Sequence, residues 1–119
     1  MGGGKEVERE TRYIALRITE KQYSVWRGLP YGKSKLIAEL VKSFSPKEKE
    51  EYARIQQTII DLPPTLVEKR QIAVEKESGV EKEELMAFFG YIAKVLSETR
   101  GDEKKAVELI RRRLGLDGG

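Results

Sequence analysis

Residues 12–18, Arg-Tyr-Ile-Ala-Leu-Arg-Ile, alternate between apolar and other side chains along the chain. A period of two over seven residues predicts a β-strand with two different faces. The backbone of a strand must hydrogen-bond to a partner, and the rest of the chain shows no second convincing strand. The simplest solution is pairing with the same strand of a second copy, which gives a symmetric homodimer.

Helical patterns follow this strand through the rest of the chain. Thr19 and Gln22 form a capping box before a helix that Pro30 ends. A second helix is predicted over residues 33–44, which carry a broad apolar stripe. Ser45, Pro46 and Glu48 mark the start of a third helix, and further helices are predicted over about 65–78 (opened by a capping box at Thr65 and Glu68), 81–99 and 103–114.

The predicted fold is therefore mainly α, with one strand that pairs across a homodimer. Residues 1–11 are rich in glycine and charge and are predicted to be a disordered arm. Residues 12–45 form the strand and two helices of a dimerisation module, and residues 46–119 form a helical C-terminal domain. About 33 residues are too few to fold alone, so two intertwined chains would supply the missing core.

Composition excludes several kinds of chemistry. The chain of 119 residues has no cysteine and no histidine, which removes disulfides, thiol catalysis, and the commonest metal ligand and general base. The carboxylates lie on solvated helix faces beside lysines, so we expect neither an enzyme, nor a metal, nor a cofactor. No apolar segment is long enough for a membrane span, and we expect a cytoplasmic protein.

The charge is distributed unevenly. The net charge is +3. Basic residues outnumber acidic ones before residue 46, whereas the two signs nearly balance after it. The abundance of Lys, Glu and Arg, together with the absence of asparagine, is typical of proteins from hyperthermophiles and suggests an archaeal-like, thermophilic source.

The strand-helix-turn-helix pattern of residues 12–44 resembles the ribbon-helix-helix family of DNA-binding proteins, to which the Met and Arc repressors belong. The resemblance rests on the alternating R-Y-I-A-L-R-I, the cap at Thr19, the Y-G-K-S-K-L-I turn and the apolar stripe through Phe44. One departure is a short first helix, with Gly28 and Pro30 near its end. The resemblance covers about a third of the chain or less and implies a homodimer whose two strands enter the major groove.

The resemblance also implies roles for individual residues. The side chains that would contact bases are Tyr13, Ala15 and Arg17, and the alternative is that they form only the solvated face of a small sheet. The residues that would contact phosphates are Arg12, Lys33, Ser34 and Lys35. The residues that would form the dimer core are Ile14, Leu16, Ile18, Trp26, Ile37, Leu40, Val41 and Phe44.

Three functions remain open from the sequence. The first is a transcriptional repressor or other regulator, from a plasmid, virus or chromosome, that binds double-stranded DNA at a palindromic operator as a homodimer or tetramer. The second is an antitoxin whose residues 46–119 bind a partner protein. The third is a helical protein-interaction module without DNA binding. The cluster Arg111-Arg112-Arg113 fits a solvated helix C-terminus better than a DNA contact.

Overall fold

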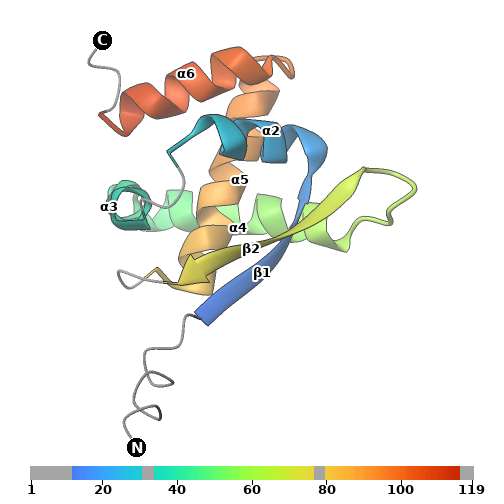
Figure 1. The fold of residues 1–119 in the computed structure, drawn as a ribbon, viewed down its shortest axis with the longest axis horizontal. Coiled ribbons are helices and arrows are strands. Elements are labelled where there is room, and N and C mark those ends of the chain that lie inside the picture. Colours follow the sequence, from blue (N-terminus) through green and yellow to red (C-terminus); the bar gives the residue numbers. More distant parts are fainter. Residues whose placement is uncertain (1–11, 31–33, 77–79, 116–119) are drawn as a thin grey trace, which may run out of the picture.

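The computed structural model describes residues 12–30, 34–76 and 80–115. These residues form a mainly helical protein with one two-stranded antiparallel sheet (Figure 1). Strand β1 is followed by three helices, strand β2 and two more helices. The elements are β1 (Arg12–Thr19), α2 (Glu20–Gly28), α3 (Ser34–Lys42), α4 (Pro46–Asp61), β2 (Lys69–Lys76), α5 (Lys82–Glu98) and α6 (Glu103–Arg113).

The sheet corrects two predictions. Strand β1 does not lack a partner in its own chain, because it pairs antiparallel with β2 along its whole length. The helix predicted over about 65–78 is wrong for the same reason, since residues 69–76 are that second strand. Ile72 and Val74 are β-branched, alternate with Gln71 and Ala73, and pair with the apolar residues of β1. The spacing of two between Ile72 and Val74 fits a strand and not a helix. The helix prediction rested on the apparent capping box at Thr65 and Glu68.

The capping boxes predicted at the starts of α2 and α4 are confirmed, whereas the one predicted at Thr65 and Glu68 begins no helix. The side chain of Thr19 accepts a hydrogen bond from the backbone of Gln22, and the Gln22 side chain accepts one from the backbone of Thr19. Ser45 and Glu48 form the same reciprocal pair at the start of α4. These caps satisfy backbone N–H groups that have no partner inside the helix.

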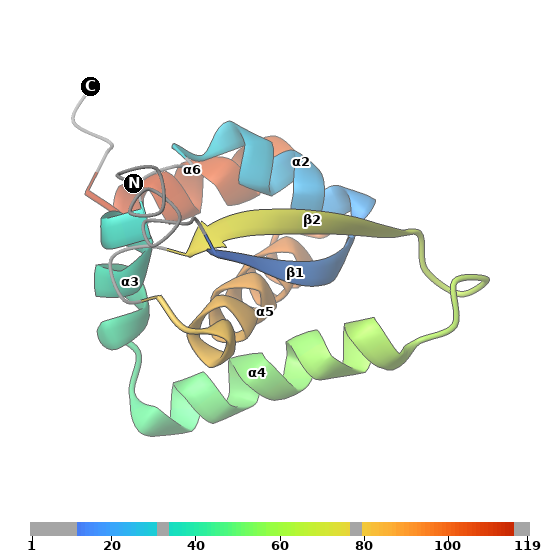
Figure 2. The same cartoon turned by 60° about the horizontal axis from the view of Figure 1, so that its bottom comes forward.

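Helix α5 is the centre of the core. Its Phe88 and Phe89 are fully buried, and the ring centroid of Trp26 lies 6.0 Å and 5.1 Å from theirs. The sheet, α2, α3, α4 and α6 surround this helix (Figures 1 and 2). Buried residues before and after residue 45 therefore form one continuous core.

The residues predicted as dimer core are buried inside a single chain. Leu16, Ile18, Trp26, Ile37, Leu40, Val41 and Phe44 are each at most 7% exposed, and Ile14 packs against them while partly buried. Burial of these residues was predicted correctly. Helices α4 and α5 of the same chain cover them, so their burial does not require a second copy. Among the described residues, no helix is both long and apolar enough to cross a membrane.

Candidate functional site

The outer face of the sheet is open to solvent. The side chains of Tyr13, Ala15 and Arg17 on β1 are exposed, as are those of Gln71 and Ala73 on β2. In Figure 2 α5 lies behind the sheet and α4 lies below it, and no described element crosses in front of the sheet in either ribbon view (Figures 1 and 2). Tyr13 is 64% exposed, which is unusual for a large aromatic side chain.

The strand register sets the pattern of this outer face. Arg17 lies opposite Gln71, and Ala15 lies opposite Ala73. The two central rows of the face therefore carry two methyl groups and two long hydrogen-bonding side chains. Tyr13 lies opposite Glu75 at one end, and Thr19 lies opposite Lys69 at the other. The structure brings the three predicted base contacts together on one surface and adds Gln71 and Ala73. Sequence reasoning missed these two because it assigned them to a helix; their alternation with Ile72 and Val74 was the available signal.

The two strands are strongly basic. They contain five Lys or Arg residues and one Glu. Their balance of +4 exceeds the +3 of the whole chain, so the remaining residues together carry a slight negative excess. The net positive charge of the protein thus lies in the two strands.

A buried network of glutamine side chains fixes β1 against the helices. The amide of Gln22 donates to the side-chain oxygen of Gln56 at 2.9 Å and to the backbone oxygen of Phe89 at 2.8 Å. The amide of Gln56 donates to the backbone oxygen of Arg17 at 3.0 Å. Both glutamines are at most 1% exposed. Because buried polar groups are costly to leave unpaired, this network holds the backbone of Arg17 in a defined place.

The start of β2 is fixed by contacts with α2 and α4. The guanidinium of Arg70 lies 3.9 Å from the ring centroid of Tyr23 and 3.5 Å from the carboxylate of Glu20. The ammonium group of Lys69 donates to the backbone oxygen of Ile60. These two cations therefore have partners within the protein. Arg17 is exposed on the outer face of the sheet.

Only one residue of the predicted phosphate-contacting set has a described side chain. Lys35 is exposed in the first turn of α3. Lys33 lies outside the described residues, and the side chains of Arg12 and Ser34 do too. Phosphate contact by this set stays a prediction.

The arginines at the end of α6 contact their own chain. Arg111 donates to the backbone oxygen of Gly28 at 3.4 Å. The guanidinium of Arg113 lies 5.2 Å from the ring centroid of Phe44 and 5.1 Å from that of Tyr91. The end of this helix therefore contacts α2, α5 and the segment between α3 and α4.

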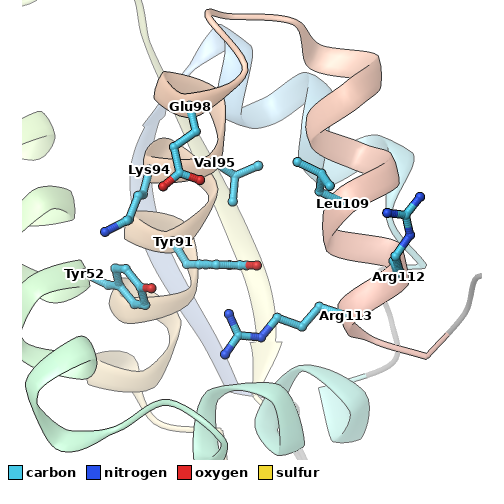
Figure 3. Close-up of a pocket in the computed structure, with 8 residues that line it drawn as sticks. All are labelled: Tyr52, Tyr91, Lys94, Val95, Glu98, Leu109, Arg112 and Arg113. Atoms are coloured by element: carbon cyan, nitrogen blue, oxygen red, sulfur yellow. The ribbon is translucent and has the colours of Figure 1, made fainter.

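A cavity of about 390 Å³ lies beside Arg113, between α4, α5 and α6 (Figure 3). Tyr52, Tyr91 and Arg113 point toward one another in this view, and the carboxylate of Glu98 lies on the other side of the Tyr91 ring. The full lining is Tyr52, Tyr91, Lys94, Val95, Glu98, Leu109, Arg112 and Arg113. Sequence reasoning did not predict this cavity, because its residues come from three separate helices.

Electrostatics around the cavity favour the protonated forms of two groups. Burial, followed by the nearby carboxylate of Glu48, raises the pKa of the Tyr52 phenol above its ordinary value. For the Arg113 guanidinium, partial burial lowers the pKa, but the hydrogen bond with Tyr91 and the surrounding groups outweigh it and raise the pKa overall. Arg113 is thus a permanent cation at the edge of this cavity.

No known family model, curated protein or solved structure matches this chain. Within the part of the chain that the structure describes, no group of three or more His, Cys, Asp or Glu residues is placed to hold a metal ion.

Proposed function

We propose that this protein binds double-stranded DNA by inserting its two-stranded sheet into the major groove. The observation that carries the proposal is the open outer face of the sheet, on which Arg17 lies opposite Gln71. The major groove of B-form DNA is wide enough for a two-stranded β-ribbon. The helices cover only the other face, so nothing in the described fold would block that approach.

The side chains of the outer face suit the edges of base pairs. Arginine can donate two hydrogen bonds to guanine, and glutamine can form a pair of hydrogen bonds with adenine. The methyl groups of Ala15 and Ala73 allow the backbone to approach closely and can contact the methyl group of thymine. Phosphate contacts beside the groove are expected from Arg12 and from the exposed Lys35 at the start of α3.

This proposal differs from the ribbon-helix-helix arrangement in one respect. A single chain supplies both strands, so a single molecule can present the complete ribbon. A homodimer on a palindromic operator, as in a transcriptional repressor, would place two such ribbons in successive major grooves. The homodimer remains part of the proposal. It would match the symmetry of a palindromic DNA site, and strand pairing does not require it.

The test is to measure DNA binding by variants with substitutions on the outer face of the sheet. DNA sites are first selected from a random pool by the wild-type protein, and affinity is then measured by fluorescence anisotropy. We expect Arg17→Ala and Gln71→Ala each to weaken the selected site by about 10- to 100-fold, the equivalent of losing one bidentate base contact. Arg54→Ala, which removes an exposed arginine of α4, is the matched control and should change affinity little.

Salt dependence gives a second readout. The logarithm of the association constant should fall linearly with the logarithm of salt concentration, with a slope of about 0.9 for each phosphate contacted. Arg17→Ala should relax sequence preference while the protein stays folded. Equal affinity of the wild type for selected and random DNA, or identical behaviour of the Arg17 and Arg54 variants, would contradict base reading by this face.

A further inference from the structure

Arg113 is a cation whose partners are aromatic. Its guanidinium lies against the rings of Phe44 and Tyr91, and it forms no ion pair with any described carboxylate. Aromatic faces attract a cation but leave the outer N–H groups of its planar fork available as donors. The same guanidinium lines the cavity between α4, α5 and α6, where Figure 3 shows it pointing toward Tyr52 and Tyr91. This position suits an anionic group.

The charges around the cavity limit how much negative charge a ligand can carry. Lys94 is paired with Glu51 at 3.6 Å, so its charge is already balanced. Glu98 belongs to the lining, and the carboxylate of Glu48 is close enough to affect both Tyr52 and Arg113. These carboxylates would repel a polyanion such as a nucleoside triphosphate, whereas a single carboxylate can bind Arg113.

The remaining lining suits a flat apolar body. The rings of Tyr52 and Tyr91 lie 5.4 Å apart, between centroids, at an angle of 57°. Both line the cavity while largely buried, with 3% and 8% of each residue exposed. Val95 and Leu109 add aliphatic surface, and Leu109 is 37% exposed. A volume of about 390 Å³ is within the range of small-molecule sites. Aromatic rings pack favourably against one another in offset or edge-to-face geometry.

We propose that this cavity binds a small aromatic monocarboxylate, with the carboxylate on Arg113 and the ring between Tyr91 and the aliphatic residues of α5 and α6. The site is separate from the sheet, and neither the proposal nor its test depends on DNA binding.

Matched ligands test the chemistry of the site. The probe is 3-phenylpropionate, titrated into the full-length protein by isothermal calorimetry. We expect one site with a dissociation constant of about 1 mM or tighter. 3-Phenylpropionamide, which lacks the charge, and 3-cyclohexylpropionate, which lacks the flat ring, should each bind at least several-fold more weakly. Inorganic phosphate should not compete.

Matched variants locate the site. We expect Arg113→Gln to weaken binding of 3-phenylpropionate by about tenfold or more, because it removes charge-assisted hydrogen bonds. Glu98→Gln should tighten binding by about threefold, because it removes a nearby like charge. Arg111→Gln, two residues away and directed at Gly28, is the control and should bind as the wild type does. Circular dichroism confirms that each variant is folded.

Amide chemical shifts complete the test. Addition of 3-phenylpropionate should shift the backbone signals of residues 91–98 and 109–113 and leave those of 13–17 unchanged. Binding that survives Arg113→Gln unchanged would overturn the proposal. So would equal affinity for the amide, shifts confined to the sheet, or no saturation at about 10 mM ligand.

Discussion

Gly90 lies where the packing of two helices leaves no space for a side chain. It lies on α5 where α4 crosses, and a Cβ atom added there would be 1.8 Å from the backbone oxygen of Tyr52. Backbone atoms of a packed helix cannot move aside as a flexible side chain can. The two longest described helices, α4 and α5, can approach this closely only because residue 90 has no side chain.

We expect Gly90→Ala to lower the free energy of unfolding by about 3 kcal/mol or more, through overpacking. Helix propensity alone would predict the opposite sign, since alanine favours a helix over glycine by about 1 kcal/mol. Urea unfolding measures the change, and Ser97→Ala, exposed on the same helix, is the control. A Gly90→Ala protein as stable as the wild type would show that α4 and α5 are farther apart than the structure has them.

The raised pKa of Tyr52 leads us to expect a loss of stability at alkaline pH. Its pKa is raised in the folded protein, mainly by burial. When the pKa of a group is higher in the folded state than in the unfolded state, the group stabilises the fold at pH values below its unfolded-state pKa, which is about 10 for tyrosine. That contribution is lost as the pH rises through the folded-state pKa. The free energy of unfolding should therefore fall above about pH 10 because the buried phenol must ionise.

The substitution Tyr52→Phe isolates this effect. It keeps the ring that packs edge-on against Phe44, with centroids 4.9 Å apart, but removes the ionisable group. The loss of stability between about pH 10 and pH 12 should be smaller in this variant than in the wild type. Tyr13→Phe, which removes an exposed phenol, is the control. Parallel stability curves for the wild type and Tyr52→Phe over this pH range would refute the assignment.

At the scale of elements, the two buried glutamines join four separate segments. Their side-chain amides connect β1, α2, α4 and α5 through four hydrogen bonds of 2.8–3.0 Å, in one of which the side-chain oxygen of Gln22 accepts from the backbone N–H of Thr19. Every buried side-chain nitrogen and oxygen in the described part of the chain has a partner. A complete network of this kind fixes one relative position of the sheet and the helices.

We expect Gln56→Leu to destabilise the protein by about 2–4 kcal/mol, because the backbone oxygen of Arg17 and the amide of Gln22 lose their partner inside the core. Gln57→Leu, which alters the exposed neighbour, should cost far less. The double variant Gln22→Leu and Gln56→Leu should cost less than the sum of the two single changes, because the two residues share a bond. Strict additivity in thermal or urea unfolding would argue against the network.

Local sequence patterns predicted some of these elements and not others. The starts of α2 and α4 depend on capping by Thr19 and Ser45, which acts within three residues, and both were predicted correctly. Strand β2 depends on β1, about fifty residues earlier, and local pattern could not reveal that pairing. The outward direction of Tyr13 and Arg17 followed from alternation, whereas the cavity beside Arg113 requires knowing how three helices pack.

At the scale of the whole molecule, one chain completes its own core. The residues expected to be covered by a second copy are covered by α4 and α5. Folding should therefore not depend on association, although association on DNA remains compatible with it. An obligate intertwined dimer would behave differently, since its stability is inseparable from protein concentration.

We expect the thermal midpoint of unfolding to stay constant over a hundredfold dilution without DNA, and the protein to sediment with the mass of one chain at the lowest concentration. Scanning fluorimetry and sedimentation equilibrium measure the two quantities. A midpoint that falls steadily on dilution, with the mass of two chains throughout, would restore the intertwined dimer and contradict the self-contained core.

The separation of the two strands along the chain has a consequence for biosynthesis. Thr19 pairs with Lys69 at one end of the sheet and Arg12 pairs with Lys76 at the other. A nascent polypeptide that has left the ribosome only as far as α4 holds β1 with no strand beside it. Translation that stops before residue 69 would yield a product in which the hydrogen-bonding edge of β1 is unpaired and the two-stranded sheet is incomplete. Such fragments should be substrates for chaperones and proteases.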